Sequence, residues 1–170
     1  LKLFTNRFVS LNMREPLANP LLSVSKKYLN VLSKMVHQLS IDRYHYVLVL
    51  IDSYEHPLTQ KALAEILNID KSYMVTILDY LEERNYILRE KNPQDRREQL
   101  IILTTKAKKD IPVIRDAIAI LNDASLENLS IEQKKTFCEI LTIISDNLSK
   151  IVSGNTEKTT VKNPKIHSII

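Results

Sequence analysis

The chain has 170 residues, of which 44% are hydrophobic and 26% charged, a composition typical of a globular domain with a real core. Its single glycine, Gly154, excludes phosphate-binding loops of the P-loop and dinucleotide types, which need several glycines where the backbone approaches phosphate. One cysteine excludes an intrachain disulfide, and no apolar run reaches the ~18 residues that span a bilayer, so we expect a cytoplasmic protein with no membrane partner.

Two helices are expected in the first third of the chain. Residues 1–19 are interpreted as an N-terminal extension, with Met13 as a candidate start. Apolar residues then recur at spacings of three and four over 21–39, which is typical of an amphipathic helix. Asp42 is a good N-cap for a second helix that runs to about Tyr54.

Two shorter helices follow, separated by a turn. Helical patterns over 59–67 and 70–85 each open with a residue that caps helices well, a threonine in the first and an aspartate in the second. The second pattern is expected to bury Val75 together with the leucines that follow it. It ends near Asn85, a residue type that tolerates the left-handed conformation common at helix C-termini.

A short hairpin with a charged tip comes next. Extended segments at 86–89 and 99–103 flank the turn-forming run Asn92-Pro93-Gln94-Asp95. Residues 84–109 contain eight basic and three acidic side chains, whereas the net charge of the whole chain is only +4. The positive charge therefore gathers around this hairpin, which favours a polyanionic partner.

The C-terminal part of the chain predicts two long helices. A helical pattern over 104–123 contains Pro112, which is expected to kink the helix or to mark its restart. Ser130 and Gln133 have the spacing of a capping box, and the helix that they open leads to the tail. This polar tail, over 153–170, is expected to be loosely held.

A helix-turn-helix followed by a hairpin is the arrangement of a winged helix, in which the second helix can enter the major groove of DNA. Its outward face offers polar side chains that can donate to base edges and phosphates. The arginines of the hairpin suit the narrow, electronegative minor groove. The candidate DNA-binding residues are Thr59, Lys61, Lys71, Ser72, Tyr73, Thr76, Arg96 and Arg97.

Three motifs in this region have a specific spacing. They are Leu58-Thr59-Gln60-Lys61-Ala62-Leu63-Ala64, Leu81-Glu82-Glu83-Arg84-Asn85-Tyr86-Ile87, and Asn92-Pro93-Gln94-Asp95-Arg96-Arg97 with Leu103-Thr104 six residues beyond. With these motifs the chain resembles the MarR family of transcriptional regulators over about residues 20–150. The family usually carries glycine where this chain has Asn85 and Ala107, so the turn at Asn85 is expected to be stiffer.

The resemblance implies a mostly helical fold with a small β-hairpin, divided into a DNA-binding lobe and a helical dimerisation region. The winged helix-turn-helix lobe would span 56–103, and the dimerisation region 20–55 together with 104–152. By the family pattern, Arg97 reaches into the minor groove, and Asp95 holds the wing arginine by an ion pair.

These expectations describe a homodimer that binds a pseudo-palindromic operator in double-stranded DNA. It would regulate transcription as a repressor that a small-molecule effector releases. The alternative is a winged-helix module that binds proteins and has lost DNA binding. No pair of residues stands out as a nucleophile with its base, so we expect no enzymatic activity and no cofactor.

The remaining candidates concern small ligands and metals. The resemblance implies an aromatic effector between the two regions, with Tyr28, His37, Tyr44 and Tyr46 as the candidate pocket; core or dimer positions are the alternative for the tyrosines. Cys138 is expected to be a small buried side chain, with a redox sensor as the alternative. The histidines form no compact cluster that could supply four ligands, so no metal is predicted.

Overall fold

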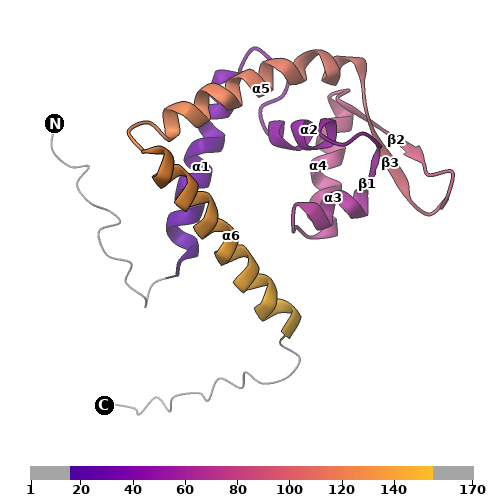
Figure 1. The fold of residues 1–170 in the computed structure, drawn as a ribbon. Helices are drawn as coiled ribbons and strands as arrows, with labels where there is room; N and C mark the ends of the chain where they lie inside the picture. Colours follow the sequence, from indigo (N-terminus) through magenta and orange to yellow (C-terminus); the bar gives the residue numbers. More distant parts are fainter. Residues whose placement is uncertain (1–15, 155–170) are drawn as a thin grey trace, which may run out of the picture. The chain divides into compact units, whose positions relative to one another are not determined.

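The computed structural model describes residues 16–154, most of which lie in helices (Figure 1). The elements in chain order are α1 (Ala18–Met35), α2 (His45–Asp52), β1 (Leu58–Thr59), α3 (Gln60–Ile66), α4 (Lys71–Glu83), β2 (Ile87–Lys91), β3 (Gln99–Leu103), α5 (Thr105–Ser125) and α6 (Ile131–Gly154). This confirms the predicted class, mostly helical with a small antiparallel sheet. The predicted extension and tail fall largely on residues 1–15 and 155–170, which lie outside the described residues.

The chain forms two units, which divide after Ser125. The first unit contains the helices α1 to α5 together with the sheet, and the second contains α6. Within residues 16–154, no helix is long and apolar enough to cross a membrane.

The helix-turn-helix, α3 and α4, is capped where the sequence predicts. Thr59 Oγ1 accepts a hydrogen bond from the backbone N–H of Ala62 (3.1 Å), and Asp70 Oδ1 accepts one from the N–H of Ser72 (2.7 Å). Each bond satisfies an N–H group that a helix leaves unpaired in its first turn. Beyond α4, Asn85 has a φ of 58°, the left-handed conformation expected of it.

The helix α2 starts later than predicted, because Asp42 is not its N-cap. It begins at His45, and the preceding residue, Tyr44, has a left-handed backbone with a φ of 63°. The carboxylate of Asp42 instead accepts a hydrogen bond from the hydroxyl group of Tyr80, which lies on α4. A long-range partner has thus replaced the local capping bond, which a sequence pattern cannot reveal.

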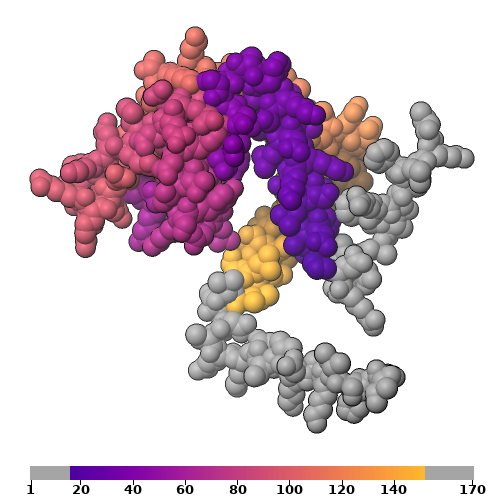
Figure 2. Space-filling view, turned by 180° about the vertical axis from the view of Figure 1, so that it is seen from behind, coloured from indigo at the N-terminus to yellow at the C-terminus, as the bar shows by residue number. Residues whose placement is uncertain are grey.

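The sheet has three antiparallel strands in the order β1-β3-β2. The strands β2 and β3 form the wing, a hairpin that extends away from the helices of its unit (Figures 1 and 2). The strand β1, which the sequence patterns did not predict, is only two residues long, and its Thr59 pairs with Leu100 of β3. This pairing fastens the start of α3 to the wing.

The main core lies between α2, α3, α4, the sheet and the first half of α5. Burial raises the pKa of Tyr86 to about 12, and its hydroxyl group donates to Asp110 Oδ2 (2.9 Å). The prediction for Val75 was wrong: this side chain is 37% exposed, because it follows the buried Met74 by about 100° around the helix. The helix α4 contributes four fully buried side chains, Met74, Ile77, Leu78 and Leu81.

The helix α5 is continuous through Pro112, so the proline does not mark a restart. A proline at this position leaves the carbonyl group of Lys108 without its helical N–H partner. Both residues are exposed, so water can hydrogen-bond to the freed carbonyl group. The second half of α5 packs against α1, where Leu32 and Val36 form a smaller cluster with Leu121.

The helix α6 opens with the predicted capping box. The N–H of Ser130 donates to Gln133 Oε1 (2.8 Å), and the N–H of Gln133 donates to Ser130 Oγ (3.1 Å). Most of its described apolar side chains are exposed, including Ile131 and Phe137. Cys138, which was expected to be buried, is exposed as well, because no side chain over 131–151 is buried in this unit.

Candidate nucleic-acid interface

The first two turns of α4 present a polar face to solvent. Lys71, Ser72 and Thr76 are exposed, and Tyr73 is 48% exposed. The neighbouring core residue Met74 is fully buried on the opposite face. The Thr76 hydroxyl group donates to the carbonyl oxygen of Ser72 (3.3 Å), which keeps this side chain close to the helix. The four candidate residues of α4 are therefore accessible to a large partner.

The wing turn holds one of its two arginines by an ion pair. Arg97 Nε and Nη2 donate to the two carboxylate oxygens of Asp95 (3.1 and 3.0 Å), and the N–H of Arg97 donates to Asp95 Oδ1 (3.0 Å). These hydrogen bonds lower the pKa of Asp95. The side chain of Arg97 is 90% exposed, and Arg96 is exposed beside it. Both guanidinium groups of the wing therefore face solvent.

A third arginine, which the sequence patterns did not single out, joins the wing to α4. On strand β2, Arg89 Nη2 lies 2.6 Å from Asp79 Oδ1, and Nη1 lies 2.7 Å from Glu82 Oε2. The Arg89 side chain is only 15% exposed. The two acids are three residues apart on α4, so they share one helix face and fit the two arms of one guanidinium group. The three-residue spacing of Asp79 and Glu82 was the only signal in the sequence for these ion pairs.

A hollow of about 350 Å³ lies where the helix-turn-helix meets the wing. It brings together residues from the start of α3, the start of α4 and the start of β3. Half of the candidate DNA-binding residues are among them. The lining consists of Thr59, Gln60, Lys61, Lys71, Arg97, Glu98 and Gln99.

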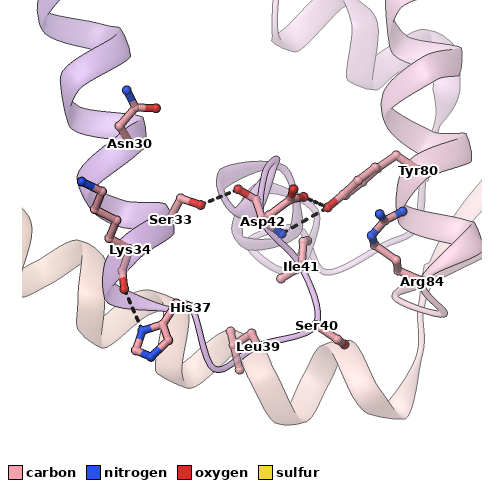
Figure 3. Close-up of a pocket in the computed structure, with 10 residues that line it drawn as sticks. All are labelled: Asn30, Ser33, Lys34, His37, Leu39, Ser40, Ile41, Asp42, Tyr80 and Arg84. Atoms are coloured by element: carbon pink, nitrogen blue, oxygen red, sulfur yellow. Dashed lines mark hydrogen bonds between the residues drawn. The ribbon is translucent and has the colours of Figure 1, made fainter.

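A larger cavity of about 600 Å³ lies between the C-terminal parts of α1 and α4 (Figure 3). The loop that precedes α2 runs between these two helices. Most of the side chains around the cavity are polar, but Leu39 and Ile41 add apolar surface, so a ligand there would meet both hydrogen-bonding and apolar groups. The lining consists of Asn30, Ser33, Lys34, His37, Leu39, Ser40, Ile41, Asp42, Tyr80 and Arg84.

Of the four candidate effector residues, only His37 lines this cavity, and the three tyrosines lie elsewhere. The Tyr28 hydroxyl group donates to Asn122 Oδ1 on α5 (2.7 Å). The Tyr44 ring lies edge-on to that of Tyr80, with 5.3 Å between the ring centroids. Tyr46 is half-buried against the main core, and burial raises its pKa. In the described part of the chain, no cluster of histidine, cysteine and carboxylate side chains could hold a metal ion.

Tyr80 lies on α4, lines the cavity, and holds the loop before α2 against this helix. Its ring carries two guanidinium groups, with the Cζ of Arg84 at 3.7 Å and that of Arg43 at 4.7 Å from the ring centroid. Its hydroxyl group donates to the Asp42 carboxylate and lowers the pKa of that group. The N–H of Asp42 donates back to the same hydroxyl oxygen (3.1 Å). The loop before α2 is thus fastened to α4 beside the cavity (Figure 3).

The fold and this interface define a winged helix-turn-helix protein. The model of the MarR family matches residues 41–99, which include α2, the helix-turn-helix and most of the wing. Over these residues the chain matches this family of transcriptional regulators, as its motifs predicted. Regulators of this family are non-enzymatic transcription factors, which agrees with the prediction that the chain is not an enzyme.

Three known proteins illustrate the similarity. The HTH-type transcriptional repressor YetL of Bacillus subtilis (strain 168) is 28% identical over 131 residues, which are 76% of this chain and 78% of YetL. The structure of the S. aureus MepR-DNA complex gives a TM-score of 0.72 at 20% identity, covering 78% of this chain and 98% of that chain. The transcriptional repressor CouR, bound to a 23-mer DNA duplex, gives a TM-score of 0.67 at 24% identity, covering 78% of this chain and 94% of that chain. The two structures establish the shared fold.

Proposed function

We propose that this protein binds double-stranded DNA at a specific sequence and regulates transcription there. The observation that carries the proposal is the exposed polar face of α4 beside a wing with two exposed arginines. The helix α4 enters the major groove, where Ser72, Tyr73 and Thr76 contact base edges. The wing enters the adjacent minor groove with Arg96 and Arg97, whose charge suits its negative potential.

Two structures of the same fold support a DNA-binding role. MepR was solved as a DNA complex, and CouR was solved on a 23-mer duplex. In this chain the excess of basic residues over 84–109 belongs to the same unit as α4. We therefore propose 56–103 as the DNA-binding lobe.

The functional unit is proposed to be a homodimer, with the dimerisation region formed by 20–55 and 104–152. Exposed apolar side chains support this: Leu22 and Val24 on α1, and Ile140 and Leu148 on α6. A second copy would cover these side chains, whose exposure to water is unfavourable. It would also set two α4 helices about 34 Å apart, one turn of duplex, on a pseudo-palindromic operator. Sedimentation equilibrium at micromolar concentration should give twice the chain mass, and a monomer would contradict the proposal.

A repressor released by a small aromatic effector is the proposed mode of regulation. YetL is named as a transcriptional repressor. In this chain the larger cavity adjoins α4 through Tyr80 and Arg84, so an occupant could alter the position of α4 relative to α1. An effector acts only if it binds the DNA-incompetent form more tightly than the competent one. Of the candidate contacts Tyr28, His37, Tyr44 and Tyr46, only His37 lines this cavity, so His37 is the contact that the proposal keeps.

The decisive experiment is selection of bound duplexes from a random DNA pool, followed by a gel-shift titration of the enriched sequence. We expect a palindromic consensus whose affinity falls steeply with salt, because basic side chains displace condensed counterions. No enrichment over several rounds would contradict DNA binding and favour the protein-interaction module.

The effector proposal has its own test. Phenolic acids, lipophilic drugs and oxidants would be screened for thermal stabilisation of the protein, and each stabilising compound would then be added to the protein-DNA complex. A compound that stabilises the free protein should release the DNA. If none of these classes has either effect, the result favours a repressor that acts without an effector.

A further inference from the structure

The hollow between the helix-turn-helix and the wing carries an excess of positive charge. Lys61, Lys71 and Arg97 line it against one carboxylate, that of Glu98. Glu98 Oε2 accepts a weak hydrogen bond from Asn92 Nδ2 (3.5 Å), on the wing side of the hollow. The hollow is therefore a cationic site, although no single segment of the sequence contains a basic run at that point.

The cationic groups of the hollow keep donor capacity for an anion. Within residues 16–154, neither Lys61 nor Lys71 forms an ion pair with a carboxylate. Arg97 uses Nε and Nη2 on Asp95, which leaves its Nη1 atom for another acceptor at the rim. Thr59 Oγ1 accepts the capping bond from α3, so its hydroxyl hydrogen also remains to be donated.

The frame of the hollow is fixed before any ligand arrives. The pairing of Thr59 with Leu100 holds the start of α3 against β3. On the other side of the wing, Arg89 ties β2 to α4 through Asp79 and Glu82. Because three elements are held together in the free protein, binding an anion orders the lysine side chains but requires little further ordering of the backbone.

We propose that this hollow seats one backbone phosphate of the bound DNA. The inference rests on the proposed function and specifies it. A phosphodiester carries one negative charge on two accessible oxygens, which Lys61 and Lys71 bind from the helix-turn-helix side, at the edge of the minor groove that Arg97 enters from the wing side. Since the hollow lies between α4 and the wing, the seated phosphate borders both the groove that α4 reads and the groove that the wing enters. The bound phosphate therefore fixes the position of α4 and of the wing along one strand of the DNA.

The test uses the full-length protein and its selected operator with one neutral methylphosphonate at a time. Each duplex is titrated with the wild type, Lys61→Gln and Lys71→Gln. If both lysines bind one phosphate, a single methylphosphonate position weakens wild-type binding several-fold but weakens binding of either variant much less. Each lysine substitution should also reduce the salt slope of log K by about 1 for each protomer, and hence by about 2 for the proposed homodimer. Lys91→Gln is the matched control, since Lys91 is an exposed wing lysine outside the hollow.

Two negative results have different meanings. If the random pool yields no bound duplex, the proposed function fails and the phosphate seat fails with it. If an operator is found but Lys61→Gln and Lys71→Gln couple to different phosphates, or to none, the seat is overturned while DNA binding stands. Because both lysines are exposed, the variants should unfold at the wild-type temperature, which circular dichroism checks.

Discussion

The hydroxyl group of Tyr80 donates a hydrogen bond to the carboxylate of Asp42, although 38 residues separate the two in the sequence. Tyr80 lies on α4, the proposed recognition helix, and Asp42 lies in the loop that joins α1 to α2. Both residues line the larger cavity. The bond therefore links the proposed reading helix directly to the wall of the proposed effector site.

Replacing Tyr80 with phenylalanine should separate this link from the packing of the ring. The variant keeps the ring beneath the guanidinium groups but loses the bonds of the hydroxyl group to the carboxylate and the N–H of Asp42. We expect a loss of about 1 kcal/mol in the free energy of unfolding, small because Asp42 is exposed to water. Urea denaturation measures it. Tyr54→Phe, at an exposed tyrosine outside the cavity, is the control and should change nothing; equal stability of the two variants would contradict the role of the bond.

The geometry of Arg89 predicts that lysine cannot replace it. A lysine keeps the charge but cannot reach Asp79 and Glu82 together with two parallel donors. Because the two acids are partly exposed, Arg89→Lys should cost only about 1 kcal/mol of stability. It should weaken operator binding more than its stability loss explains, because the wing is no longer held against α4. Lys91→Arg on the same strand is the control, and unchanged operator affinity of Arg89→Lys would contradict the positioning role.

Local signals in the sequence located most of the winged helix-turn-helix. Thr59 and Asp70 cap their helices as expected, since an N-cap bond joins residues only two or three positions apart. The left-handed conformation of Asn85 is equally local. These signals, with the family motifs, gave the helix-turn-helix and the hairpin, and they left the candidate residues of α4 on an exposed face.

The features that the sequence did not predict depend on contacts between distant segments of the chain. Strand β1 has two residues and exists only because Thr59 meets Leu100 across the fold. Asp42 was predicted to cap α2 because aspartate is a common N-cap residue. Its actual partner, Tyr80, is 38 residues away, so the sequence pattern did not reveal it. Both cavities have linings drawn from separate elements, so no periodicity or spacing could have predicted them.

Asn85 provides a test of the turn after α4. Its φ of 58° is strained for a residue with a Cβ atom, and only asparagine, aspartate and glycine adopt it readily. Asn85→Gly should leave stability nearly unchanged, whereas Asn85→Ala should cost about 1 kcal/mol. Thermal unfolding compares them. The control is Asn30→Ala on helix α1, which should be neutral or slightly stabilising, and a neutral Asn85→Ala would contradict the backbone argument.

Arg97 is the wing residue expected to matter most for operator binding. Arg97→Ala removes a cation that lies both on the wing tip and at the rim of the hollow, so operator affinity should fall by roughly a factor of ten. Asp95→Asn keeps the arginine but weakens the hydrogen bonds that orient it, and the loss should be smaller. Gel-shift titration at fixed salt measures both variants. If Arg97→Ala binds like the wild type, the wing does not contact DNA.

His45 makes the stability of the main core depend on pH. This histidine is 3% exposed, its Nε2 atom lies 3.1 Å from the carbonyl oxygen of Ile41, and burial lowers its pKa. In the unfolded chain its pKa returns to about 6.5, so below that pH the unfolded state binds more protons and the native state loses stability. Urea denaturation at pH 7.5 and 5.5 should show the wild type losing more stability than His45→Gln, which has no titrating ring. The nearby Asp42 attracts the protonated form and moderates the effect. If the two proteins lose stability in parallel between these pH values, His45 is not the group responsible.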